Sequence, residues 1–163
     1  MEHTDYRHIS KVTSIQEEKL RFDTFNARTA WELGSFMVER MYEKGIEMSI
    51  SIRRPGGCIL FQHCTEKTNL NNQNWMRRKF NTVVTMERCS YGCWADAHIS
   101  GETAEFHGLN ASDYVFCGGG FPIRLKTGEM VAVIIVSNLP HEQDHQFVVD
   151  GLADWLGVTD LPR

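Results

Sequence analysis

The spacing of hydrophobic residues changes abruptly at Gly45, and this change most limits the folds open to the chain. Residues 26–44 place apolar side chains at helical spacing, whereas residues 46–53 alternate between apolar and polar. A period of 3.6 predicts a helix with one buried face, and a period of two predicts a strand with one polar face. The chain is therefore expected to pack helices against a sheet.

Two hairpins predict how that sheet is built. The turn Pro55-Gly56-Gly57 separates the first strand from a returning strand over residues 58–64. Later, residues 121–125 and the apolar run 130–136 flank a turn at residues 126–129. A further short strand is predicted at residues 114–117. The expected class is α+β with a mostly antiparallel sheet, not a doubly wound parallel fold.

Further helices are expected around these strands. A short helix is predicted within residues 13–21, in an N-terminal extension of residues 1–24. An asparagine-rich entry precedes a helix over residues 75–88, and a helical piece covers residues 90–98. Leu139-Pro140 opens a last helix, because proline is tolerated in a first helical turn. The whole is expected to form one domain, residues 1–163.

Composition and charge exclude several classes of protein. The 163 residues carry 17 Lys+Arg and 21 Asp+Glu, a net charge of -4, so the chain has no overall attraction for nucleic acid or anionic membranes. No apolar run reaches the roughly 18 residues of a membrane helix, and the N-terminus lacks signal-peptide features. Five cysteines show no disulfide pattern. We expect a cytoplasmic protein with free thiols and no nucleic-acid or membrane partner.

Residues 141–145 match H-E-x-x-H, the pattern that places two histidines one turn apart on a zinc ion. The context is unfavourable, because Pro140 puts the motif in the first turn of a helix and few acidic residues follow. The alternative is a polar helix start in which Glu142 and Asp144 interact favourably with the helix dipole. No residue is assigned as a metal ligand.

A second candidate site is the helix face that carries Trp75, Arg78, Lys79 and Thr82, opposite an apolar face. An aromatic ring with two cations can bind an anion, or stack on a planar ligand or a partner. The alternative is a solvated face whose indole is half covered by a neighbour.

Glycines and cysteines offer weaker signals. Gly118-Gly119-Gly120 permits an anion-binding nest or, as the favoured interpretation, a tight turn. Cys89, Cys93 and His98 lack the C-x-x-C spacing of a structural zinc site. An axial haem ligand requires only one His, Cys or Met in an apolar cavity, a condition that selects no particular residue here.

Four strings, in order along the chain, together resemble an uncharacterised family related to the GlcG and HbpS haem-binding proteins and to the C-terminal domain of the PduO adenosyltransferase. The resemblance spans roughly residues 25–156. The strings are Asn72-x-x-Trp75-x-x-Arg78-Lys79-x-x-Thr82-Val83, residues 118–123, residues 136–140 and Asp144-His145.

This resemblance implies a profilin-like three-layer α/β/α fold with a central antiparallel sheet. It also implies a homo-oligomer in which dimers assemble into a larger ring, and haem or corrinoid binding in the wider group. In the family pattern the position of His141 varies while Asp144-His145 recurs, which makes H-E-x-x-H look accidental. Asn138 stands where glycine is usual, so a changed turn is expected there.

The leading hypothesis is an oligomeric, cytoplasmic ligand-binding protein of the GlcG/HbpS-like group. Its ligand would be planar or anionic, and haem is the first candidate. Two alternatives remain: a small hydrolase that uses the Asp-His pair with or without a metal, and a structural assembly protein without a ligand. The proposed site residues are Trp75 for stacking, Arg78 and Lys79 for carboxylates or phosphates, the Gly119-Gly120 turn, and Asp144 with His145 as acid/base or ligand groups.

Overall fold

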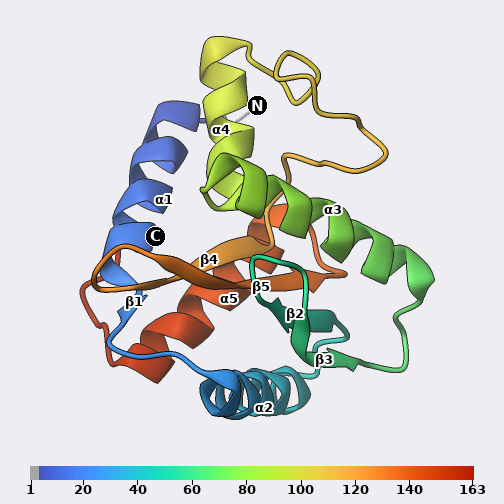
Figure 1. Ribbon diagram of the computed structural model, residues 1–163, viewed down its shortest axis with the longest axis vertical. Coiled ribbons are helices and arrows are strands. Elements are labelled where there is room, and N and C mark those ends of the chain that lie inside the picture. Colours follow the sequence, from blue (N-terminus) through green and yellow to red (C-terminus); the bar gives the residue numbers. More distant parts are fainter. Residues whose placement is uncertain (1–3) are drawn as a thin grey trace.

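Helices and strands follow the predicted order in the computed structural model (Figure 1). The structure describes residues 4–163, so the first three residues of the predicted N-terminal extension lie outside it. The elements are α1 (Tyr6–Lys19), β1 (Arg21–Phe22), α2 (Ala27–Glu43), β2 (Ser49–Arg53), β3 (Ile59–Cys64), α3 (Leu70–Met86), α4 (Ser90–Ser100), β4 (Gly120–Leu125), β5 (Met130–Ser137) and α5 (His141–Leu156).

The five strands form one sheet in the order β1-β4-β5-β2-β3. β1 runs parallel to β4, whereas the other three neighbouring pairs are antiparallel. Both predicted hairpins are present, as β2–β3 and β4–β5. The α+β class with a mostly antiparallel sheet is therefore confirmed.

Helices cover both faces of the sheet and give it three layers. Val133 and Ile135 of β5 pack with α3, whereas Ala132, Ile134 and Val136 join the larger core against α2 and α5. Because both faces of β5 are buried, its sequence is continuously apolar instead of alternating. The two layers of helices converge at the end of β5, where the chain turns into α5 (Figure 1).

Two predictions of local structure were wrong. Residues 114–117 are not a strand, because Val115 exchanges both of its backbone hydrogen bonds with the Thr82 hydroxyl on α3 instead of with a neighbouring strand. α1 begins at Tyr6, well before the predicted start at Thr13, and it packs along α4.

α3 also begins earlier than predicted, at Leu70. Asn69 caps the helix through its side chain, and Asn72 returns a side-chain bond to the backbone N–H of Asn69. This reciprocal capping explains why an asparagine-rich segment is helical.

Within residues 4–163, no helix is long and apolar enough to cross a membrane. All five cysteines are free thiols.

Candidate functional site

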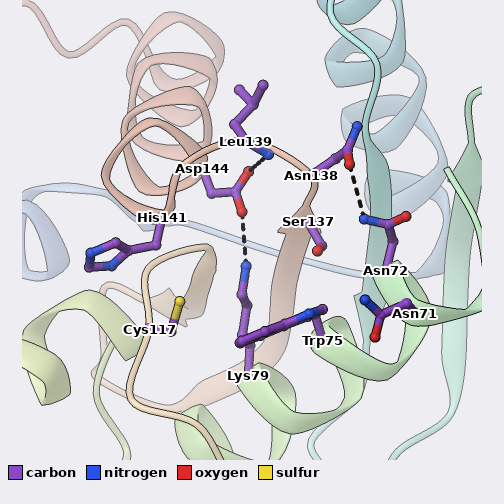
Figure 2. A pocket seen from close by; sticks show the side chains of 10 residues that line it. All are labelled: Asn71, Asn72, Trp75, Lys79, Cys117, Ser137, Asn138, Leu139, His141 and Asp144. Atoms are coloured by element: carbon purple, nitrogen blue, oxygen red, sulfur yellow. Dashed lines mark hydrogen bonds and ion pairs between the residues drawn. The ribbon is translucent and has the colours of Figure 1, made fainter. Parts of the chain in front are cut away.

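A pocket of about 310 Å³ opens where α3, the end of β5 and the first turn of α5 meet (Figure 2). We call it the Lys79 pocket. Its lining comes from three segments that are distant in sequence: Asn71, Asn72, Trp75, Lys79, Cys117, Ser137, Asn138, Leu139, His141 and Asp144.

A buried ion pair lies at the bottom of the Lys79 pocket. The Lys79 Nζ atom donates to Asp144 Oδ2 at 2.9 Å and to the carbonyl oxygen of Val136 at 3.0 Å. The second carboxylate oxygen, Asp144 Oδ1, accepts from the backbone N–H of Leu139 at 3.0 Å. The two side chains are only 3% and 2% exposed, so the protein has removed both charges from bulk water.

Burial raises the pKa of the Asp144 carboxyl, because desolvation penalises its charged form. The Lys79 ammonium and the backbone N–H groups of Asn138 and Leu139 act in the opposite direction on that pKa. A desolvated pair of this kind adds little net stability compared with well-packed apolar side chains. Its presence at the bottom of an open pocket therefore favours a functional role over a purely structural one.

The glycine triplet lets the chain pass close to this pair. A Cβ atom on Gly118 would lie 2.2 Å from the carbonyl oxygen of His141, and one on Gly119 would lie 2.7 Å from Lys79 Nζ. Gly119 also has a φ of 125°, which glycine adopts readily. Gly120 donates to the Ser90 hydroxyl at 2.9 Å. The triplet thus makes a close structural approach, and neither Gly119 nor Gly120 lines the pocket.

Cys117 and His141 form one side of the pocket (Figure 2). Burial raises the pKa of the Cys117 thiol, so it is protonated at neutral pH. Burial lowers the pKa of His141, so its ring is neutral there. Its Nδ1 atom accepts from the backbone N–H of Gly118 at 3.2 Å, and its Nε2 atom lies 3.1 Å from a Glu142 carboxylate oxygen.

Asn138 forms the turn between β5 and α5 with a φ of 151°. Its side chain donates to the carbonyl oxygen of Glu47 at 2.9 Å and accepts from Asn72 at 3.2 Å. The asparagine is thus held in a backbone conformation that favours glycine, so the turn has a glycine-like geometry.

The predicted ligand-binding face of α3 is not a solvated face. Lys79 and Thr82 are buried, and the long segment of residues 101–119 lies along the same side of the helix. Arg78 donates to the carbonyl oxygen of Ala111 at 3.1 Å, and Arg77 pairs with Asp113 at 3.0 Å. Much of this face therefore holds a loop in place.

Arg78 stays beside Trp75, with its guanidinium carbon 4.7 Å from the ring centroid, but it does not line the Lys79 pocket. It lines a separate hollow of about 280 Å³, which we call the aromatic hollow. That hollow is lined by Arg78, Trp94, Ala97, His98, Thr103, Ala104, Glu105, Ala111, Tyr114, Val115 and Phe116.

His145 is turned away from the Lys79 pocket and is 3% exposed. Its Nε2 atom lies 2.8 Å from the side-chain oxygen of Gln16 on α1, so Nε2 carries the proton and donates. Its Nδ1 atom has no hydrogen-bond partner among residues 4–163. Burial lowers the pKa of His145 to about 3, so the ring is neutral at physiological pH.

The structure therefore places Trp75, Lys79 and Asp144 in the lining of one pocket, with Gly119 behind the ion pair, whereas Arg78 and His145 do not line that pocket. In the described part of the chain, no three His, Cys, Asp or Glu side chains are grouped to hold a metal ion. The two histidines of H-E-x-x-H have different partners, and the Sγ atom of Cys89 accepts from the backbone at the start of α4.

Comparison with known sequences agrees with this architecture. Residues 25–153 match the family model described as "Haem degrading protein HbpS-like". The chain belongs to the HbpS-like family. A UPF0303 protein of Paraburkholderia phymatum is 37% identical over 154 residues, covering 94% of this chain and 93% of the relative. A UPF0303 protein of Rhizobium rhizogenes is 36% identical over 144 residues, covering 88% of each chain.

Solved structures share the HbpS-like fold. The Ybr137w protein has a TM-score of 0.84 at 22% identity, covering 91% of this chain and 87% of that one. HbpS has a TM-score of 0.64 at 20% identity, covering 84% and 93%. A PduOC:heme complex has a TM-score of 0.57 at 17% identity, covering 76% and 88%. The family resemblance seen in the sequence is confirmed.

Most pocket residues had not been proposed from the sequence as site residues, namely Asn71, Asn72, Cys117, Ser137, Asn138, Leu139 and His141. Cys117 comes directly before the glycine triplet, and Ser137 ends the most apolar strand. Cys117 lies in a loop and Ser137 at the end of a strand, and residues in such places often surround a binding site.

Proposed function

We propose that this HbpS-like protein binds a small molecule in the Lys79 pocket. The observation that carries this proposal is the desolvated Lys79–Asp144 pair at the bottom of an open pocket. Charged groups held out of water beside an accessible cavity are typical of binding and catalytic sites. Membership of a family described by haem chemistry, and a structural neighbour solved with haem, support ligand binding in general.

Haem itself does not fit the Lys79 pocket. Of the side chains that ligate haem iron, which are His, Cys, Met and Tyr, this lining holds only His141 and Cys117. Both ring nitrogens of His141 are engaged, and burial disfavours the thiolate of Cys117. The asparagine and serine side chains around the opening also make much of the wall polar. We therefore derive no role for haem in this pocket.

A second candidate function, haem binding, is supported at the aromatic hollow. His98 Nδ1 lies 2.8 Å from the carbonyl oxygen of Trp94, an arrangement that fixes Nδ1 as the donor and leaves Nε2, which has no hydrogen-bond partner among residues 4–163, to bind a metal. Tyr114 and Phe116 supply apolar wall, and Arg78 supplies a cation for a propionate. Bound there, haem would contribute redox chemistry, while His98 would hold the iron.

Titration with four probes tests both proposals. We expect benzoate, inorganic phosphate or glucose to bind saturably in calorimetry to the native protein and to Phe106→Ala, an exposed aromatic control outside the pocket, but not to Trp75→Ala. Haemin is expected to give a saturable Soret shift that His98→Ala abolishes and His63→Ala retains.

Two results would contradict these proposals. If none of the three small probes binds, or if Trp75→Ala binds as the native protein does, the Lys79 pocket is not the site. If the Soret shift is absent or survives His98→Ala, the aromatic hollow does not bind haem through this residue.

We further propose a cytoplasmic homo-oligomer in which dimers assemble into a ring. The edge strand β3 carries no charged residue, and exposed Trp31, Tyr42 and Ile59 lie on and beside it. Exposed aromatic side chains next to an unpaired strand edge are typical of subunit contacts. Light scattering of the purified protein measures the number of subunits.

The other two hypotheses receive less support. Asp144 bonds to Lys79 and His145 bonds to Gln16, so these neighbours do not form the acid–base pair that a hydrolase would use. The Trp75–Arg78–Lys79 face is largely covered by the chain itself, which weighs against a subunit contact there. Binding of a small molecule agrees better with the geometry.

A further inference from the structure

The polar groups that still lack a partner in the Lys79 pocket indicate what it binds. We infer that its ligand is a small carboxylate with a planar body, an inference that rests on the proposed ligand-binding function. The argument depends on three observations: which groups are free, which charges are already neutralised, and which backbone groups face the opening.

The free groups are mostly hydrogen-bond donors. An ammonium has three N–H bonds, and Lys79 uses two of them, so one has no acceptor among residues 4–163. Ser137 is 4% exposed, its hydroxyl points into the pocket (Figure 2), and it makes no side-chain hydrogen bond within the described chain. The side-chain amide of Asn71 and the indole N–H of Trp75 also have no partner in that part of the chain.

Most side-chain acceptors of the pocket, in contrast, already accept a hydrogen bond; the exceptions within residues 4–163 are the Asn71 amide oxygen and the Ser137 hydroxyl oxygen, which can also accept. Both Asp144 oxygens accept bonds from Lys79 and Leu139. The Asn72 side-chain oxygen accepts from the backbone of Asn69, and the Asn138 oxygen accepts from Asn72. A ligand that brings acceptors is matched by such a surface, whereas a ligand rich in donors would leave its own groups unpaired at a cost of about 1–3 kcal/mol each.

Charge and helix geometry favour an anion. His141 and Cys117 are uncharged at neutral pH, so no free negative charge of the lining opposes an entering carboxylate. The pocket lies at the N-terminus of α5, whose cap Pro140 makes no side-chain bond to the first N–H groups. The positive end of the helix dipole therefore borders the pocket that also holds the Ser137 hydroxyl.

The shape favours a planar body. The indole of Trp75 forms one wall of the pocket (Figure 2), and the guanidinium of Arg78 packs against that ring. An indole held in this way offers a flat apolar surface to an aromatic or conjugated acid. A cavity of about 310 Å³ admits a ligand of the size of a single-ring acid.

Benzoate and benzamide test the inference, because they share ring and size and differ in charge. We expect benzoate to bind at least about 10-fold more tightly than benzamide, since hydrogen bonds to a charged acceptor are the stronger ones. Ser137→Ala is expected to weaken benzoate by roughly 10-fold. The matched control is Ser49→Ala, a buried serine paired with Ser137 in the sheet but absent from the pocket lining.

A charge substitution gives an independent test. Asn71→Asp places a carboxylate at the opening and is expected to weaken benzoate several-fold, with less effect on benzamide. Asn74→Asp makes the same change of net charge on the same helix, where Asn74 contacts Arg77 and does not line the pocket. It is expected to leave the affinity for benzoate within about 2-fold, because exposed charges are screened.

The outcomes separate this inference from the proposed function. If benzamide binds as tightly as benzoate, or if Ser137→Ala and Ser49→Ala bind benzoate equally, the carboxylate inference is wrong while the pocket remains a binding site. If Asn71→Asp and Asn74→Asp bind benzoate alike, the inference is also wrong. If inorganic phosphate, glucose, benzoate and benzamide all fail to bind, both the carboxylate inference and the proposed function are wrong.

Discussion

Asp144 and His145 are neighbours on one turn of α5, are both buried, and have opposite surroundings. Asp144 faces the Lys79 pocket and keeps its charge beside an ammonium. His145 faces α1, bonds to Gln16 and is neutral. Successive residues on a helix point about 100° apart, so adjacency in sequence does not place two side chains in one site. The first turn of α5 therefore contributes to two different environments.

The largest expected effect comes from removing one charge on the pocket side. Lys79→Met or Asp144→Asn should each lower the free energy of unfolding by about 3–5 kcal/mol, because the remaining partner is left as an uncompensated buried group. Urea denaturation monitored by circular dichroism measures the change.

The double variant Lys79→Met with Asp144→Leu tests whether the unpaired buried charge causes the loss of stability. Replacing the whole pair by apolar side chains should restore most of the lost stability. We expect the double variant to be folded yet unable to bind the probes of the Lys79 pocket. If the folded double variant binds the probes as the native protein does, the ion pair is not required for binding.

A smaller effect is expected on the His145 side, as a dependence of stability on pH. The folded-state pKa of His145 is about 3, whereas the unfolded chain takes up this proton near its ordinary value of 6.5. The contribution of His145 to the free energy of unfolding is therefore fully present above pH 6.5 and is lost as the pH falls, with about 2 kcal/mol lost by pH 5. Urea titrations between pH 7.5 and pH 5 measure this slope.

His145→Gln is the matching variant, because its side-chain nitrogen can still donate to Gln16 without titrating. The free energy of unfolding of this variant should depend much less on pH than that of the native protein. His141, whose pKa is also lowered, still contributes a smaller dependence of the same sign. Equal slopes for native protein and variant would show that His145 is not kept neutral by burial.

The smallest effect is expected at the turn that joins the two environments to β5. Asn138→Gly relieves a φ of 151° but removes the side-chain bonds to Glu47 and Asn72. Because relief of strain and loss of hydrogen bonds are of similar size, stability should change by less than about 1 kcal/mol. A large loss in thermal denaturation would show that the asparagine contacts, not the backbone, hold the turn.

The sequence predicted the fold better than the site. Hydrophobic spacing located α2 and β2, the turn at residues 55–57 located β3, and a continuous apolar run located β5, because each of these signals is local in the sequence. β1 has two residues and exists only through its pairing with β4, so no local pattern predicts it.

The site depended on contacts that no local pattern contains. Lysine is seldom buried, so Lys79 alone gave no reason to expect a carboxylate 65 residues later as its partner. Ser137 resembles the ordinary end of a strand, and its free hydroxyl becomes visible only when α3 and α5 are placed around it. The sequence identified Trp75, Lys79 and Asp144, but it could not separate Arg78 and His145 from them.

α1 lies outside the region that the family model covers, yet it completes the interior of the molecule. Gln16 bonds to His145, and Glu17 pairs with Arg88 at 2.8 Å. A chain cut back to residues 25–153 would leave an imidazole and a guanidinium without these partners. The region that the family model matches is therefore narrower than the smallest piece expected to fold stably, and a truncated chain for binding studies needs to keep the N-terminal helix.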